Sequence, residues 1–599
     1  MEKRKISIIL VCILIMTVIF TGCSKGNDLS VETTKEEDAE TRDTVMKYGS
    51  ENRDVSRSSK ADDLDATGVT EDQEIFDIEV TESSINTNEI MIGDSYKMTD
   101  SSAILNSVER DKAYGYQYDG LYPNTEEYTK IFEKGFMDTL QSPLSTFSID
   151  VDTASYANIR KNINYGLLPE MDAVRIEEML NYFNYEYDEP TGKNPFSINT
   201  EIGRCPWNQD NYLLMVGVQG KDVDKATLPK SNLVFLIDVS GSMDQEDKLP
   251  LLKNAFSQLV EQLTEDDRVS IVVYASKSGV VLDSVPGNEK RIILSALKDL
   301  TAGGSTAGAG GIEKAYALAQ ENFIAGGNNR VILATDGDFN VGPSSPKELE
   351  ELIEQKRESG IFLSVLGFGM GNIKDNRMEL LADKGNGNYA YIDSSMEAKK
   401  VLVDEMSGTL LTIAKDVKIQ LEFNPYSVES YRLIGYENRA LNNEDFKNDK
   451  VDAGELGAGH SVTAIYEIVP NRKDSLLYGR ESLKYQTKEQ VINKEYQDEI
   501  TEVRLRYKLP DSNKSNEILQ VVSYDNTPVN KIYLSEDFYF AAAVAEFGML
   551  LRNSEYKGTS SIENLLMLAE KGLGKDEDGY RTEFINLVEK YEELINNRW

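Results

Sequence analysis

The sequence predicts an α/β protein with a central, doubly wound and mostly parallel sheet. An N-terminal α+β unit and a C-terminal region, first β-rich and then helical, are predicted to flank it. Between residues 228 and 414, short apolar runs alternate with helical patterns. Few polar residues interrupt these runs, which is typical of parallel strands covered on both faces. Outside this region, strands and helices occur in separate groups, which favours α+β architecture.

The central region, residues 228–414, contains strand and helix candidates in alternation. The expected strands are Asn232–Ile237, Arg268–Tyr274, Gly279–Ser284, Arg330–Ala334, Ile361–Phe368 and Tyr389–Ile392. The expected helices are Lys248–Leu263, Glu289–Leu300, Gly310–Phe323, Pro346–Gln355, Asn376–Lys384 and Met396–Leu411. Pro346 at a helix start and Gly360 beyond its end fit the usual asymmetry of helix termini.

Residues 115–227 form the predicted N-terminal α+β unit. Its expected elements are a strand at Ser145–Val151, helices at Thr153–Tyr165 and Asp172–Phe183, and two strands within Phe196–Val223. Asp172 is expected to cap its helix, with Arg175 and Glu178 on the exposed face. Asp150 and Asp152 follow the first strand, and we interpret them as a strand end and a helix cap.

Residues 415–599 form the predicted C-terminal domain. Strict alternation predicts antiparallel strands with one solvated face, at Val417–Phe423, Ser461–Ile468 and Glu502–Leu509. Helical patterns then follow at Phe538–Arg552, Ser560–Gly572 and Tyr580–Asn596. No internal repeat is evident.

The first 22 residues have the layout of a signal peptide. Basic residues precede an apolar run, Ile8–Phe20, which is short for a membrane span. Thr21 and Gly22 stand directly before Cys23 and resemble a bacterial lipobox, although Phe20 stands where Leu is usual. The resemblance implies cleavage before Cys23 and a lipid on its sulfur, hence a cell-membrane protein anchored on the extracytoplasmic face. An uncleaved anchor and a plain secretory signal are the alternatives.

Residues 23–114 are acidic, rich in Ser, Thr and Asn, and without sustained apolar periodicity, so we expect a disordered tether. The whole chain carries a net charge of −38, which argues against nucleic acid as a partner. Of three cysteines, Cys12 lies in the signal and Cys23 is the lipidation candidate. Cys205 is left alone, so no intramolecular disulfide is expected, and Cys205 is predicted to be a buried hydrophobic residue.

Three loops in the central region carry oxygen-bearing side chains. Asp238, Ser240 and Ser242 follow the first strand. Thr306 lies in a Gly-Gly-Ser-Thr loop, and Asp336 lies in Thr-Asp-Gly after a later strand. Carboxyl ends of strands are where ligands bind in open α/β sheets, and oxygens are the ligands that Mg²⁺ prefers. Helix caps and plain turns without metal are the alternative.

The set Asp-x-Ser-x-Ser, then Thr, then Thr-Asp-Gly resembles the metal-ion-dependent adhesion site of von Willebrand factor type A (vWA) domains, which are Rossmann-like. All five positions match. The resemblance implies that Ser240, Ser242 and Thr306 ligate Mg²⁺ (or Mn²⁺ or Ca²⁺) directly. Asp238 and Asp336 then act largely through water and hydrogen bonds, and one coordination position stays open for an Asp or Glu carboxylate of a partner protein.

The flanks show a narrower resemblance. Ser145–Tyr156, Val174–Met179 and Cys205-Pro-Trp207 resemble the N-terminal domain of bacterial vWA lipoproteins, and the region after Lys415 resembles their C-terminal domain. That C-terminal domain has no assigned function, so this resemblance adds family membership but little chemistry.

Catalytic motifs are weak by comparison. The one histidine, His460, is expected on an exposed loop and lacks a nucleophile elbow, and zinc ligands are too few. We therefore expect a non-enzymatic binding protein with no small-molecule substrate. A structural scaffold of the cell envelope with a stabilising metal, and an envelope hydrolase using acidic residues, are the alternatives.

Overall fold

The computed structural model describes residues 125–597, except 225–226, 305–308, 338–345, 407, 409–410, 452, 472–493 and 524–533. The predicted signal peptide, Cys23 and the tether up to residue 114 lie outside the described residues. Within the described part, no helix is both long and apolar enough to span a membrane.

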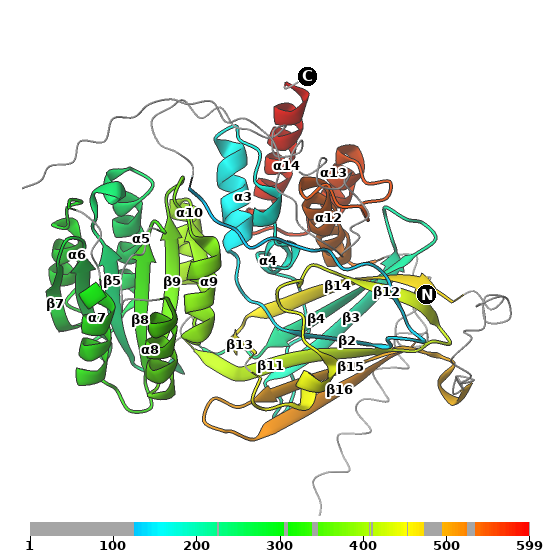
Figure 1. Ribbon diagram of the computed structural model, residues 1–599, viewed down its shortest axis with the longest axis horizontal. Coiled ribbons are helices and arrows are strands. Elements are labelled where there is room, and N and C mark those ends of the chain that lie inside the picture. Colours follow the sequence, from blue (N-terminus) through cyan, green and yellow to red (C-terminus); the bar gives the residue numbers. More distant parts are fainter. Residues whose placement is uncertain are drawn as a thin grey trace, which may run out of the picture. The chain divides into compact units, whose positions relative to one another are not determined.

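The central sheet contains the predicted strands (Figure 1). Its order is β10-β9-β8-β5-β6-β7. The strands are β5 (Ser231–Asp238), β6 (Arg268–Tyr274), β7 (Ser278–Pro286), β8 (Asn328–Thr335), β9 (Ile361–Phe368) and β10 (Tyr389–Ile392). All pairings are parallel except that of the edge strand β7 with β6. Strand β5 pairs with β6 on one side and β8 on the other, which is the topological switch point of a doubly wound sheet.

Alternate residues of β5 enter two different hydrophobic cores. Leu233, Phe235 and Ile237 pack with the helices of one face, and Phe235 stacks on Phe256 at 4.2 Å between ring centroids. Val234 and Leu236 pack against the other face. The covering helices are α5 (Leu249–Gln262), α6 (Lys290–Lys298), α7 (Ala309–Glu321), α8 (Pro346–Glu358) and α9 (Asp375–Lys384). Two-sided burial explains the uninterrupted apolar runs and confirms the predicted fold class.

Strands from before and after the central domain share sheets. One sheet has the order β1-β12-β14-β4-β3, and in the other β2 and β15 both pair with β11. The members are β1 (Met137–Asp138), β2 (Leu144–Ser148), β3 (Phe196–Arg204), β4 (Tyr212–Gly220), β11 (Thr412–Phe423), β12 (Val428–Ile434), β13 (Gly454–Gly457), β14 (Ser461–Pro470), β15 (Glu499–Lys508) and β16 (Ser515–Ser523). The two sheets bury one common core. The flanks at 115–227 and 415–599, treated separately in the sequence analysis, are therefore joined by strand pairing, and we call them together the flanking body.

Helices of both flanks also share a core. The helices are α3 (Ala154–Asn164), α4 (Ile176–Asn181), α12 (Glu536–Leu551), α13 (Ile562–Lys571) and α14 (Tyr580–Asn596). Phe183 lies edge-on to Phe540 and Phe584, which come from the other end of the chain.

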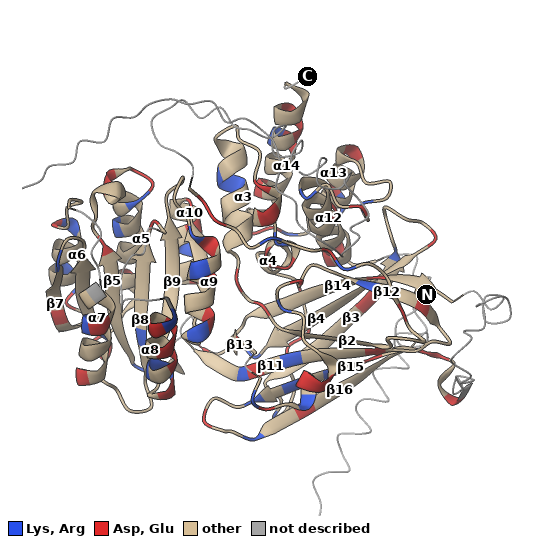
Figure 2. Cartoon of the chain, in the orientation of Figure 1, with Lys and Arg blue, Asp and Glu red and all other residues tan. Residues whose placement is uncertain are grey.

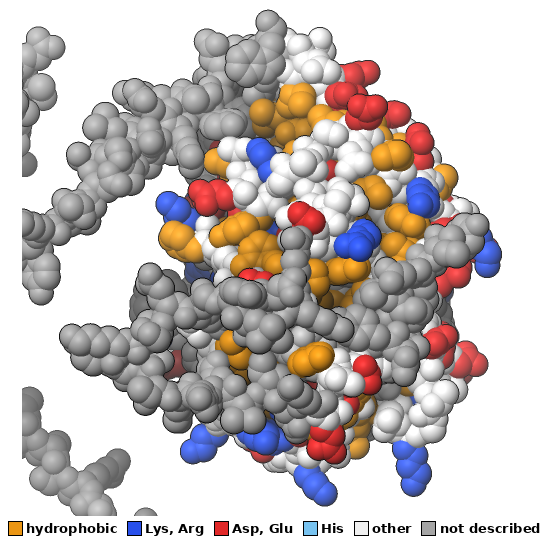
Figure 3. Space-filling view, turned by 90° about the vertical axis from the view of Figure 1, so that its right-hand side faces the viewer, with side chains coloured by type: hydrophobic (Ala, Val, Ile, Leu, Met, Phe, Trp, Pro, Cys, Tyr) orange, Lys and Arg blue, Asp and Glu red, His pale blue; other side chains and the backbone are white. Residues whose placement is uncertain are grey.

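On the face drawn in Figure 3, hydrophobic side chains are mixed with acidic and basic ones. Scattered exposure of this kind is normal for a protein surface.

Three local predictions differ from the structure. Asp172, expected to cap its helix, lies in a 3-10 turn, Met171–Ala173, and α4 begins only at Ile176. The helix expected at Met396–Leu411 is not a continuous α-helix: α10 (Ser395–Lys399) passes into a π-helical turn, Lys400–Asp404, and Met406 and Gly408 are again α-helical. Strand β11 begins at Thr412, opposite Gly457. Arg175 and Glu178, expected on an exposed face, are both buried because they form an ion pair at 2.7 Å in the interior.

Candidate metal centre at the switch point

Asp238 and Asp336 lie at the same edge of the central sheet. Asp238 is the last residue of β5, and Asp336 directly follows β8, its parallel neighbour. Both side chains are fully buried. In Figure 2 the strands β5, β8 and β9 carry few charged residues. This edge, next to the switch point, is where open α/β sheets bind ligands.

The first loop turns its hydroxyls toward the same place. Asp238 Oδ1 accepts a hydrogen bond from the backbone N–H of Ser240 at 2.8 Å. The Oγ atoms of Ser240 and Ser242 are 3.0 Å apart. Ser242 belongs to a short 3-10 turn, Gly241–Asp244, because the chain leaves the sheet here. The strand end and turn thus hold one carboxylate and two hydroxyls together.

The Thr-Asp-Gly loop closes the other side. Thr335 Oγ1 donates to Asp238 Oδ2 at 3.4 Å, and the Ser242 hydroxyl lies within hydrogen-bonding reach of Asp336. Gly337 has a φ of +99°, and a Cβ there would come within 2.6 Å of the Asn372 carbonyl oxygen. Only glycine fits this turn, which explains the third letter of the motif.

Thr306, the remaining predicted ligand, lies outside the described residues. The residues just before it are described, and they flank the first loop. Gly303 N–H donates to the Val239 carbonyl at 2.8 Å, and the Gly304 carbonyl accepts from Gly241 N–H at 3.0 Å. Four predicted residues, Asp238, Ser240, Ser242 and Asp336, are therefore brought together, and the glycine-rich loop begins beside them.

A lysine that the sequence analysis did not single out completes the site. Lys248 Nζ lies 2.9 Å from Asp336 Oδ2 and 3.4 Å from Asn372 Oδ1, and both partners of the ion pair are buried. Lys248 precedes helix α5 by one residue, and no motif marks it. Lys248 contacts Asn372, which lies 124 residues later in the chain, and local sequence patterns cannot reveal such a contact.

The two carboxyl groups differ in electrostatics. Burial raises the pKa of Asp238 to about 6, with hydrogen bonds from Ser240 acting in the opposite direction. Burial also acts to raise the pKa of Asp336, but the Lys248 ammonium and hydrogen bonds from Lys248, Asn372 and Ser242 hold it below its usual range. Asp336 is therefore ionised at neutral pH, whereas Asp238 takes up a proton as the pH falls through about 6.

The donor set fits a hard divalent cation. Two carboxylates and two hydroxyls, all oxygen groups, converge at a sheet edge, where Asp238, Asp336 and Ser240 are buried and Ser242 is exposed. Mg²⁺ and Ca²⁺ select oxygen ligands, and burial of two acidic groups needs a compensating positive charge. The described part of the site holds no histidine or thiol ligand, so zinc is a poor match.

The flanking body reaches the loops of this site. Lys161 Nζ of α3 lies 2.7 Å from Asp247 Oδ2, next to Lys248 in the chain. The backbone N–H groups of Thr125 and Glu127 donate to the carbonyls of Gly371 and Ile373 at 2.8 and 2.9 Å. These carbonyls flank Asn372, which contacts Lys248. The loop that precedes Lys248 and the loop around Asn372 therefore both contact residues outside the central domain.

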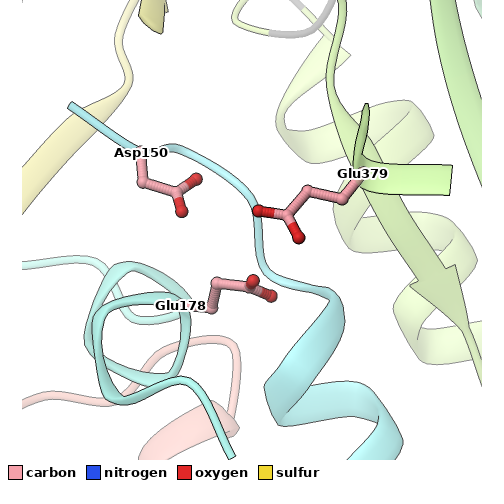
Figure 4. Close-up of side chains that lie close together, drawn as sticks. All are labelled: Asp150, Glu178 and Glu379. Atoms are coloured by element: carbon pink, nitrogen blue, oxygen red, sulfur yellow. The ribbon is translucent and has the colours of Figure 1, made fainter. Parts of the chain in front are cut away.

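A second acidic cluster lies at the junction of the central domain and the flanking body. The carboxylates of Asp150, Glu178 and Glu379 point toward one another (Figure 4), and their oxygens lie within 4.8 Å. Arg439 Nε pairs with Asp150 at 3.0 Å, and Arg175 pairs with Glu178. Because two arginines already bind these carboxylates, we interpret the cluster as a structural junction. Arg439 also binds Asp152. Neither Asp150 nor Asp152 makes the expected side-chain cap of α3.

Two other predicted residues have clear positions. Cys205 is buried, as expected, and burial raises the pKa of its thiol well above the usual range. His460 is not exposed as expected: its ring nitrogens are buried, and burial lowers its pKa.

Three family models match parts of this chain. The von Willebrand factor type A domain family matches residues 232–405, a family described as von Willebrand factor matches residues 122–215, and the family described as uncharacterized protein YfbK, C-terminal, matches residues 408–594. A von Willebrand factor type A protein of known structure from Catenulispora acidiphila is 16% identical, with a TM-score of 0.35, over 64% of this chain and 89% of that one.

Two curated relatives are similar in sequence. The uncharacterized protein sll0103 of Synechocystis is 28% identical over 36% of this chain and 50% of its own length. The uncharacterized protein YfbK of Escherichia coli is 44% identical over 474 residues, which cover 78% of this chain and 81% of that protein. The chain therefore belongs to the YfbK family and contains a von Willebrand factor type A domain.

Proposed function

We propose that this protein is a lipid-anchored binding protein of the extracytoplasmic face of the cell membrane. In this proposal its vWA domain holds Mg²⁺ (or Mn²⁺ or Ca²⁺) and engages an acidic group of a partner protein, without catalysis. The observation that carries the proposal is the convergence of Asp238, Ser240, Ser242 and Asp336 at the switch point. vWA domains typically mediate protein–protein interactions and commonly bind a divalent metal, which supports the same proposal.

The hydroxyl-bearing and the acidic residues would have different roles at the metal. The hydroxyls of Ser240 and Ser242, with Thr306, would ligate the cation as neutral donors. Asp238 would orient the loop through its bond to Ser240 N–H, and Asp336 would be held by Lys248. A bound divalent cation would supply a strong local positive charge for a carboxylate. Neutral first ligands leave most of that charge uncompensated, which favours an anionic partner.

A metal-dependent pull-down from cell-envelope extract tests this proposal. The wild-type protein should retain a partner in Mg²⁺ and release it in EDTA, whereas Asp238→Ala should retain nothing above background. Asp266→Ala is a matched control, because Asp266 lies in an exposed ion pair with Lys230. Retention that is the same in EDTA, or in Asp238→Ala, would contradict the proposal. A melting temperature that falls in EDTA without any metal-dependent partner would favour the scaffold alternative.

A further inference from the structure

Lys248 places a fixed positive charge inside the candidate metal centre. Its ammonium is buried, 2.9 Å from Asp336 Oδ2. The stem of the side chain passes over Gly369, whose φ is +78°, and a Cβ at that position would overlap the stem. Gly369 therefore leaves room for Lys248, and Asn372 supplies a second contact at 3.4 Å. The whole Lys248 side chain is therefore buried, with its stem against Gly369 and its ammonium against Asp336.

The charges in the site define what this lysine does. Asp238 and Asp336 carry two negative charges when both are ionised, and Lys248 returns one positive charge. A divalent cation then leaves these groups with a net charge of plus one, whereas the same site without Lys248 would be neutral. Charges that are buried this close interact strongly because solvent does not screen them. Lys248 therefore opposes the cation and favours a further anion.

We propose that Lys248 is a positioning residue that holds Asp336 and supplies a counter-charge inside the site. Its charge limits the affinity of the site for a divalent cation. The same charge gives the loaded site an excess positive charge for a partner carboxylate. The inference rests on the proposed function and specifies its chemistry. Two effects act in the same direction. Removal of the ammonium ends its repulsion of the cation, and it leaves Asp336 without its buried cationic partner, so that a metal ion gains more by binding.

Calorimetric titration of Mg²⁺ into the full chain tests the inference. Lys248→Met should bind Mg²⁺ at least about tenfold more tightly than the wild type. Lys248→Gln keeps a hydrogen-bond donor but no charge, and should also bind more tightly. Lys248→Arg restores the charge and should return the dissociation constant to within about threefold of the wild-type value. Lys230→Met, in an exposed ion pair, is the matched control and should leave affinity unchanged.

Thermal unfolding supplies a readout that does not depend on any partner. Without metal, Lys248→Met should melt at a lower temperature than the wild type, and saturating Mg²⁺ should raise its melting temperature by more. Acetate added to the Mn²⁺-loaded protein, followed by electron paramagnetic resonance, should bind several-fold more weakly to the variant. Unchanged or weaker Mg²⁺ binding by folded Lys248→Met and Lys248→Gln would overturn the inference, as would unchanged acetate binding. A wild type that binds none of Mg²⁺, Mn²⁺ and Ca²⁺ would instead overturn the proposed function.

Discussion

Lys161 Nζ lies 2.7 Å from Asp247 Oδ2, and this ion pair joins helix α3 of the flanking body to the loop that leads from Ser242 to Lys248. Lys161 also donates to the Tyr391 hydroxyl at 2.9 Å. The lysine is buried, and burial lowers its pKa while Asp247 acts in the opposite direction. The contact links two parts of the chain that the sequence analysis assigned to different domains.

Asp247→Asn should destabilise the protein, because it leaves the Lys161 ammonium buried without its anionic partner. We expect the free energy of unfolding to fall by about 2 to 4 kcal/mol. Urea denaturation, with unfolding followed by circular dichroism, measures this. Asp266→Asn removes an exposed pair and should cost less than about 1 kcal/mol. Equal losses for the two variants would show that the Lys161–Asp247 pair is not a buried linkage.

The junction cluster should make stability depend on pH. Burial raises the pKa of Glu379 to about 7 and of Glu178 to about 8, with arginines acting in the opposite direction. A carboxyl group whose pKa is higher in the folded state than in the unfolded state binds more protons when folded. Its stabilising contribution is therefore present below the unfolded value of about 4.5 and is lost as pH rises through the folded value.

Glu379→Gln tests that dependence. The amide is neutral at every pH, so the decline in stability between about pH 5 and about pH 8 should become shallower than in the wild type. Urea midpoints across this range measure the slope. Glu351→Gln changes an exposed glutamate on α8 and should leave the slope unchanged. A slope that is identical in wild type and Glu379→Gln would remove Glu379 from the set of titrating groups.

Mg²⁺ affinity should fall on acidification. Burial raises the pKa of Asp238 to about 6, and a proton on this carboxyl competes with the cation. The dissociation constant should be nearly constant above about pH 7 and should rise toward tenfold per pH unit well below about pH 6. Calorimetry at several pH values checks this expectation. An affinity that stays constant down to about pH 5 would exclude Asp238 as the titrating group.

Cys23→Ser should release the protein from the membrane. A serine cannot take a thioether-linked lipid. After cell fractionation, the variant should therefore be found in the soluble fraction or as an uncleaved precursor, and not as a lipidated protein in the membrane pellet. Metabolic labelling with a radioactive fatty acid should mark the wild type and not the variant. Cys205→Ser is the control and should keep the label. Labelled, membrane-bound Cys23→Ser would contradict the anchor.

The sequence was informative wherever structure follows local pattern. Uninterrupted apolar runs predicted β5 and β8, and the order of hydroxyls and carboxylates predicted which side chains meet at their ends. Long-range pairing left no such pattern. Arg175 is buried because it pairs with Asp375, 200 residues away, so its charge alone predicted exposure. Lys248 escaped notice for the same reason, and the pairing of β2 with β11 depends on segments far apart in the chain.

Titration of Mg²⁺ into wild type and Asp238→Ala, both shown to be folded, tests the central claim most directly. Asp238 holds the Ser240 backbone and faces Asp336, so its loss removes both a charge and the fixed position of the loop. We predict saturable binding with one ion per wild-type chain and no detectable binding by the variant at the same concentrations. Equal affinities for wild type and Asp238→Ala would contradict the assignment of the metal centre.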